Sequence, residues 1–256
     1  AVLNVFKRFS NNSKTPPSKI EHKNEIARKT EDFLIFRAIF LTLQFSFTFP
    51  FLSHSTQNIT HFRHFSPLPI QFYPFPPFST FLRFPCQLTA EHLEKGGSAY
   101  VFHADTEGLN FRKAFIDAGF HLAGCCIWVK DSLVLGRSDY QWQHEPVLYG
   151  FMQNGKHHWY SDRKQTTIWN FDKPKRNANH PTSKPLDLLG YPIGNSTQEN
   201  GVVMDTFGGS GSTLMACEQM NRICYTMELD EKYASVILRR YVEDTGNADG
   251  VYVKRD

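Results

Sequence analysis

The sequence predicts an α/β fold, and three stretches of the chain predict it. An apolar run at residues 202–204 leads into a glycine-rich turn and then an apolar-periodic stretch through residue 220, the pattern of strand, turn and helix. A second short strand is expected at residues 223–227, and residues 99–151 add further strands around a helix. We therefore expect a sheet with one antiparallel member and helices on both of its faces.

The glycine-rich turn has the composition of a ligand-binding loop. Gly208, Gly209 and Gly211 place no Cβ between the backbone and a ligand. Ser212 or Thr213 can cap the helix that follows, and its N-terminal N–H groups point back toward the turn. A ligand can therefore lie against bare backbone at the start of this helix.

Glu228 stands at the end of the next predicted strand. A carboxylate at this position can accept hydrogen bonds from both hydroxyls of a ribose. The third glycine of a dinucleotide fingerprint is missing because position 214 is leucine, and no Gly-Lys-Ser/Thr sequence completes a phosphate-binding loop. These features favour a ligand with a ribose and no phosphate. A tight glycine turn in an ordinary βαβ unit is the alternative.

Length and composition set wider limits. The chain of 256 residues is long enough for one sizeable domain with an appendage. Its formal charge of +3 gives no argument for a polyanionic partner. Five irregularly spaced cysteines suggest reduced thiols and hence a cytoplasmic protein, with Cys125 and Cys126 as buried apolar residues. His157 and His158 lack neighbouring ligands at metal-site spacing, so no metal is expected.

Residues 1–92 do not have the composition of a folded domain. All sixteen glycines of the chain lie from residue 96 onward, and the first 90 residues hold sixteen of the 23 phenylalanines. No hydrophobic period of a strand or a helix is evident there. Phe, Ser, Leu and Pro share pyrimidine-rich codons, so we interpret much of residues 1–90 as an irregular segment outside the native reading frame or as disordered. The folded domain is expected at residues 93–250.

Residues 33–52 form a mostly apolar stretch of the length of a membrane span. Arg37, Gln44 and several Ser and Thr residues argue against insertion into a bilayer. We therefore expect no membrane contact, and a membrane-anchored protein is a minor alternative.

The middle of the chain predicts regular elements. A helix capped by Asp105 or Thr106 and ended by Gly119 is expected, because its apolar residues recur at helical spacing. The strands expected in this part lie at residues 99–102, 125–129 and 147–151.

Residues 152–184 carry seven Lys and Arg against two acidic residues, with tryptophan, tyrosine and phenylalanine between them. Such a loop suits contacts to phosphates combined with stacking on bases. A solvated surface loop with a few anchoring aromatic residues is the alternative. The basic residues expected to contact a nucleic acid are Lys156, Arg163, Lys164, Lys173, Lys175 and Arg176.

The end of the chain predicts a last helix. Asp230 can cap it, and Ile237 and Tyr241 follow helical spacing. Arg239 and Arg240 stand near its end and are expected on a solvated face.

Two motifs in order carry a resemblance to a known family. Residues 180–185 read His-Pro-Thr-Ser-Lys-Pro, and residues 205–213 read Asp-Thr-Phe-Gly-Gly-Ser-Gly-Ser-Thr. Together they resemble the signature of the amino-methylating DNA methyltransferases, in the N4-cytosine/N6-adenine class whose cofactor half follows the catalytic half (the β-type motif order). The resemblance runs from about residue 94 to residue 246. It implies a Rossmann-like methyltransferase sheet, S-adenosylmethionine as cofactor, and double-stranded DNA with a flipped target base as partner.

The resemblance also implies roles for individual residues. Phe207 is expected near the adenine or the methionine moiety, Glu228 at the ribose hydroxyls, and Thr182 and Lys184 at the methionine end. The full set of expected cofactor-binding residues is Thr182, Lys184, Asp205, Phe207, Gly208, Gly209, Ser210, Gly211, Thr213 and Glu228.

The catalytic tetrapeptide of the family, an Asp, Asn or Ser followed by Pro-Pro and an aromatic residue, is not found. Residues 75–78 have the two prolines and the ring, with phenylalanine in place of the hydrogen-bond acceptor. We therefore identify no catalytic residue and expect a sheet that is incomplete at the catalytic strand. The expected protein is a truncated, inactive relative of an adenine- or cytosine-specific enzyme. The alternatives are a DNA- or cofactor-binding remnant and, less favoured, a dinucleotide oxidoreductase.

Overall fold

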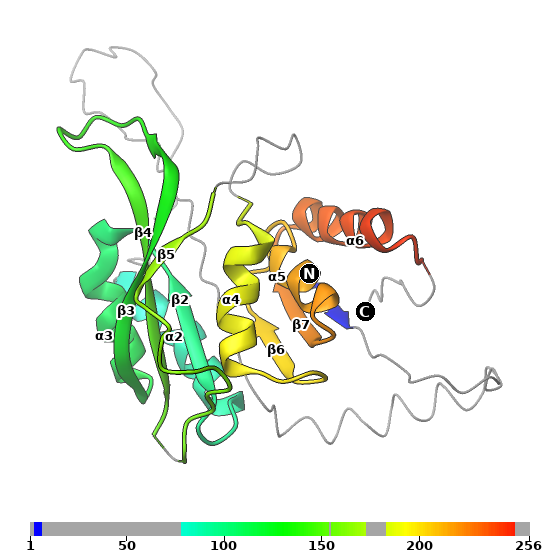
Figure 1. Cartoon of the computed structure of the whole chain (residues 1–256), viewed down its shortest axis with the longest axis horizontal. Helices are drawn as coiled ribbons and strands as arrows, with labels where there is room; N and C mark the ends of the chain where they lie inside the picture. Colours follow the sequence, from blue (N-terminus) through cyan, green and yellow to red (C-terminus); the bar gives the residue numbers. More distant parts are fainter. Residues whose placement is uncertain (1–2, 7–77, 154, 173–182, 249–256) are drawn as a thin grey trace, which may run out of the picture.

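The computed structural model describes residues 3–6, 78–153, 155–172 and 183–248. Their regular elements, in chain order, are β1 (Leu3–Phe6), α2 (Phe78–His92), β2 (Ser98–Phe102), the 3₁₀ turn η1 (Asp105–Glu107), α3 (Gly108–Asp117), β3 (Phe120–Val134), β4 (Trp142–Met152), β5 (Ile168–Asn170), α4 (Leu186–Ser196), β6 (Val202–Asp205), α5 (Ser212–Gln219), β7 (Ile223–Glu228) and α6 (Glu231–Thr245). The long β3–β4 hairpin extends past the other strands (Figure 1).

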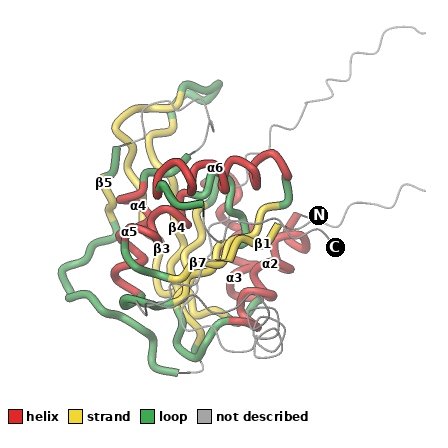
Figure 2. The backbone as a smooth tube through the Cα atoms, turned by 90° about the vertical axis from the view of Figure 1, so that its right-hand side faces the viewer, coloured by secondary structure: helices red, strands yellow, loops and turns green. Residues whose placement is uncertain are grey.

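The described strands form two sheets. In the larger sheet, ordered β2-β4-β3-β5, β4 runs antiparallel to both neighbours and β5 runs parallel to β3. β4 is thus the predicted antiparallel member of the larger sheet, and the smaller sheet adds a second antiparallel strand that was not predicted. In the smaller sheet, β6 and β7 are parallel and β1 pairs antiparallel with β7. Figure 2 shows β1 and β7 side by side.

Helices cover both faces of the strands, which confirms the predicted fold class. Successive side chains of a strand point to opposite faces. Tyr100 and Phe102 of β2 accordingly pack in one apolar cluster with α4 and α5, whereas Ala99 and Val101 pack in a second cluster with α2 and α3. Figure 1 shows α3 and α4 on opposite sides of the larger sheet.

The two sheets share these clusters although no hydrogen-bonded ladder joins their described strands. Val203 of β6 packs in the first cluster with Phe102, and Met204 packs in the second with Val101. Among the residues that the structure describes, β6 and β2 thus contribute to the same two apolar clusters without pairing in a ladder.

Helix α2 lies within the segment predicted to be irregular. Leu82, Cys86, Thr89 and Leu93 are buried at the spacing of one helical face, and α2 packs against α3. The packed region therefore begins earlier than the expected boundary at residue 93. Residues 33–52 lie outside the described residues, and none of the described helices is long and apolar enough to span a membrane.

The helix ends differ from the prediction in two places. α3 begins after the turn η1, and neither Asp105 nor Thr106 caps it with a side chain. The N-cap of α5 is Gly211, with a left-handed backbone, so neither Ser212 nor Thr213 is the cap. A left-handed φ of 76° suits glycine far better than a hydroxyl residue, and this outweighs the capping preference. The Asp230 cap of α6 is confirmed by its bond to the Lys232 N–H, at 2.8 Å.

Candidate functional site

The glycine turn connects β6 to α5 and lies against β7. The Gly208 N–H donates to the Met227 carbonyl at 2.8 Å, and the Gly211 N–H donates to the Gly208 carbonyl at 2.8 Å. A Cβ on Gly208 would lie 2.4 Å from Thr226 Oγ1, so only glycine permits this approach. The turn is therefore held in place by the neighbouring strand and its shape depends on glycine.

Glu228 contacts this turn directly. Its Oε2 accepts a hydrogen bond from the Gly209 N–H at 2.7 Å, and its Oε1 accepts one from the Asp230 N–H at 2.9 Å. Each carboxylate oxygen has two lone pairs, so both oxygens retain capacity for a ligand hydroxyl. The glycine turn, which follows β6, and Glu228, which ends β7, are thus in direct contact.

Asp205 ends β6 and is fully buried behind the turn. Burial raises the pKa of its carboxyl to about 6. Hydrogen bonds from the Thr213 side chain and the Phe207 N–H lower this pKa but do not outweigh burial. The Asp205 carboxylate therefore orders the backbone at the start of the turn, through its hydrogen bond from the Phe207 N–H. Phe207 itself is half-buried and packs beside the cluster of α2 and α3.

Lys184 lies just before α4 and is buried. Its Nζ donates to Glu145 Oε1 at 2.7 Å and lies 4.7 Å from the centre of the Phe102 ring. Its charge also acts on Asp205, where it opposes the larger rise in pKa that burial causes. Lys184 thus lies between the ends of β2 and β6. The sequence by itself predicted no role for Glu145, which stands between His144 and Pro146.

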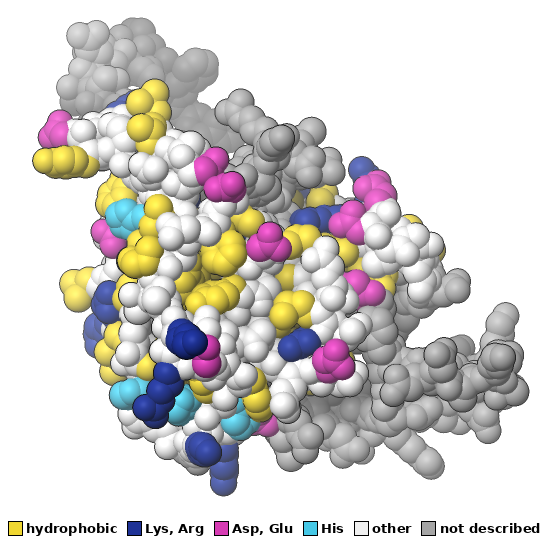
Figure 3. Space-filling view, viewed as in Figure 1, with side chains coloured by type: hydrophobic (Ala, Val, Ile, Leu, Met, Phe, Trp, Pro, Cys, Tyr) yellow, Lys and Arg dark blue, Asp and Glu magenta, His cyan; other side chains and the backbone are white. Residues whose placement is uncertain are grey.

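The expected DNA contacts are only partly described. Lys156, Arg163 and Lys164 are exposed. The Lys156 carbonyl lies against Gly96, just before β2 begins. The Lys184 ammonium lies over the ring of Phe102, the residue that ends β2. Figure 3 shows basic and histidine side chains together at the lower end of the face in view. Thr182, Lys173, Lys175 and Arg176 lie outside the described residues.

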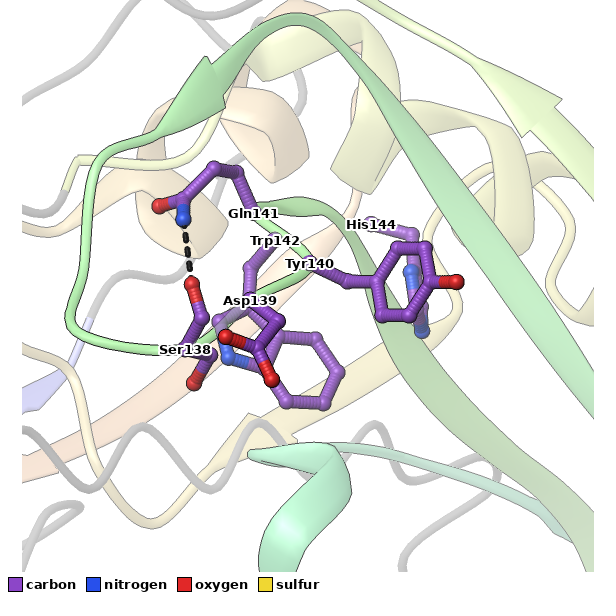
Figure 4. A pocket seen from close by; sticks show the side chains of 6 residues that line it. All are labelled: Ser138, Asp139, Tyr140, Gln141, Trp142 and His144. Atoms are coloured by element: carbon purple, nitrogen blue, oxygen red, sulfur yellow. Dashed lines mark hydrogen bonds between the residues drawn. The ribbon is translucent and has the colours of Figure 1, made fainter.

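A pocket of about 500 Å³ lies at the tip of the β3–β4 hairpin and not at the glycine turn. Figure 4 shows the Tyr140 ring beside His144, and Gln141 bonded to the Ser138 carbonyl. The lining residues are Ser138, Asp139, Tyr140, Gln141, Trp142 and His144. All six residues come from one exposed turn and its flanks. The pocket therefore includes neither Glu228 nor any residue of the glycine turn.

Helix α6 holds the glycine turn from its other side. The Arg240 Nη1 donates to the Ser210 carbonyl and to Ser212 Oγ, at 3.1 Å each. The expectation of a solvated face therefore fits Arg239, which is exposed, and is wrong for Arg240, which is half-buried. The spacing of the helix places these two adjacent side chains in different directions.

Replacing Arg240 by glutamine is expected to loosen the turn. Two hydrogen bonds from a charged donor are lost, so amide hydrogen exchange at residues 209–212 should accelerate about tenfold. Arg239→Gln is the matched control and should leave the exchange unchanged. Equal exchange rates in the two variants would contradict this role of Arg240.

Comparison with known proteins places the chain in a family. The model of a family described as DNA methylase, of the N6/N4 class, matches residues 71–239. Type II methyltransferase M2.MboI of Moraxella bovis is 35% identical over 88 residues, which cover 33% of this chain and 32% of that protein. Type II methyltransferase M.XycI of Xanthomonas campestris pv. cyanopsidis is 25% identical over 157 residues, covering 56% and 52%. The chain thus spans about a third to a half of these relatives.

Solved structures agree on the fold. The M1.HpyAVI complex with S-adenosylmethionine superposes with a TM-score of 0.60 and 19% identity, covering 85% of this chain and 95% of that one. The cytosine-N4-specific PvuII DNA methyltransferase gives a TM-score of 0.61 with 15% identity, covering 87% and 84%. At these identities the likeness is evidence for the fold, and the family match extends over more than half of the chain. This chain belongs to the N6/N4 family of DNA methylases.

Proposed function

We propose that the chain binds S-adenosylmethionine at the glycine turn, as a member of a family that methylates exocyclic amines of adenine or cytosine in DNA. The observation that carries the proposal is the contact between the Glu228 carboxylate and the Gly209 N–H, at 2.7 Å. This contact brings a carboxylate, which can accept from ribose hydroxyls, beside bare backbone, and a nucleoside requires such an arrangement.

The residues of the site fit this cofactor. Glu228 would hold the ribose hydroxyls, Gly209 and Gly211 would let the nucleoside lie close to the backbone, and Phe207 would contact an apolar part of it. When bound, S-adenosylmethionine supplies an electrophilic methyl group on its sulfonium.

Two solved neighbours support the choice of cofactor. M1.HpyAVI and the modification methylase TTHA0409 of Thermus thermophilus were both solved as complexes with S-adenosylmethionine. The NAD alternative receives no such support, and it leaves residues 180–185 without a role.

We further propose that this chain binds its cofactor without completing methyl transfer. The amine of a flipped base is a weak nucleophile and must be held in line with the methyl group by a hydrogen-bond acceptor. The family match begins at residue 71 and so includes residues 75–78, earlier than the resemblance at about residue 94 indicated. These residues have phenylalanine where the family's tetrapeptide has its acceptor, and a phenyl ring cannot accept this bond.

Calorimetry and a transfer assay test the two statements separately. Titration of the whole chain with S-adenosylmethionine should show binding, and titration with NAD should show none. Radiolabelled methyl incorporation into unmethylated DNA should not exceed that of the Glu228→Ala variant. Binding of NAD alone would contradict the cofactor, whereas incorporation above this background would contradict the loss of turnover.

A further inference from the structure

Glu145 lies between two lysines at the end of the larger sheet. Its Oε1 lies 2.7 Å from Lys184 Nζ and its Oε2 lies 3.3 Å from Lys130 Nζ. Because each oxygen has its own cation, the carboxylate is held in one orientation. The three side chains form a cluster with one negative and two positive charges.

The strand register produces this cluster. Glu145 of β4 pairs directly with Trp128 of β3, and Lys130 lies two residues further along β3 on the same face. Two positions after Glu145, Val147 pairs with Phe102, the last residue of β2. Glu145 therefore lies just past the carboxyl end of β2.

Lys184 is the most buried member of the cluster. Its side chain is 4% exposed, and its ammonium lies near the Phe102 and Trp128 rings. Burial by itself would raise the pKa of Glu145, but the two lysines hold it below its ordinary value, so this carboxyl stays ionised. The charge of Lys184 also acts on Asp205 at the end of β6.

The cluster has capacity for one more anion. Among the described residues, Glu145 is the one hydrogen-bond acceptor of Lys184, and an ammonium has three donors. One positive charge of the cluster remains uncompensated by Glu145. A buried ammonium is stabilised by an anionic partner. A ligand carboxylate matches both the free donors and this charge.

We propose that Glu145 is a positioning residue, which holds the Lys184 ammonium where its free donors bind the α-carboxylate of the cofactor's amino-acid end. The inference rests on the proposed function and extends it to Glu145. Lys130 fixes the orientation of the Glu145 carboxylate from the opposite side. The segment before α4 is thereby anchored to the sheet through a single ion pair.

Two nucleosides separate positioning from a general structural role. S-adenosylmethionine has the amino-acid end, and 5′-methylthioadenosine lacks it. In calorimetric titrations of the whole chain, Glu145→Gln is expected to weaken binding of S-adenosylmethionine about tenfold and to change binding of methylthioadenosine less than about twofold. Lys184→Gln should show the same selectivity, and the double variant should be no weaker than the weaker single variant. Asp117→Asn, which breaks the exposed pair with Lys113, is the matched control and should change neither affinity.

Each outcome decides a different statement. Equal weakening of both nucleosides by Glu145→Gln, or tighter binding of S-adenosylmethionine, overturns the positioning role and leaves the proposed function intact. Failure of the unsubstituted chain to bind either nucleoside overturns the proposed function and this inference together. If Glu145→Gln does not fold, Glu145→Asp provides the comparison: selective weakening of S-adenosylmethionine supports the role, and an equal effect on both nucleosides overturns it.

Discussion

Replacement of Glu228 by alanine is expected to weaken S-adenosylmethionine binding by about a hundredfold or more. The carboxylate would bind the ribose hydroxyls, and each hydrogen bond to a charged group contributes about 1.5 to 3 kcal/mol, so losing two costs at least about 3 kcal/mol. The variant also removes the acceptor of the Gly209 N–H. Isothermal titration of the folded chain measures the change directly.

Glu231→Ala provides the control for this experiment. Glu231 is an exposed acidic residue in the first turn of α6, three positions after Glu228, so its removal changes the net charge by the same amount. Its affinity should stay within about twofold of the unsubstituted chain. A similar loss in both variants would show that overall charge, and not the contact with Gly209, governs binding.

Asp205→Asn is expected to change the pH dependence of folding. The folded chain raises the pKa of this carboxyl from 3.8 to about 6, so it binds the proton more tightly than the unfolded chain does. The resulting stabilisation is fully present below pH 3.8 and is lost as the pH rises through about 6. The asparagine variant lacks this titration, and its free energy of unfolding should rise relative to the unsubstituted chain by up to about 3 kcal/mol between acid and neutral pH.

Urea unfolding at about pH 3.5 and about pH 7.5 measures this difference. Asp187→Asn serves as the control, because Asp187 is an exposed residue of α4. Its free energy of unfolding should follow that of the unsubstituted chain at both pH values. A difference between Asp205→Asn and the unsubstituted chain that does not change with pH would contradict the raised pKa.

Local patterns predicted the glycine turn and its neighbours well. β6, the turn, α5 and β7 follow one another in the chain, and each has its own apolar run or glycine signal. Because a βαβ unit brings the ends of its two strands to the same edge, the contact of Glu228 with Gly209 follows from sequence order alone. The parallel pairing of β6 with β7 agrees with this.

Two local predictions failed because a different local signal was stronger. Capping preference pointed to Ser212 or Thr213, but the left-handed backbone at Gly211 placed the N-cap one residue earlier. The composition of residues 1–92 concealed the helical spacing of Leu82, Cys86 and Leu93, which α3 and β2 cover. Burial of this face stabilises α2 although Pro85 lies inside it.

The sequence by itself determined the α/β class, the glycine turn with Glu228, and the family, because these depend on short-range order along the chain. Only the tertiary structure decided that Lys184 pairs with Glu145 and that Arg240 holds the turn. The first pair is separated by 39 residues, and its contact arises from the register of β3 and β4 and the packing of α4 on them. Such contacts depend on which faces become buried together, and no local pattern of residues specifies this.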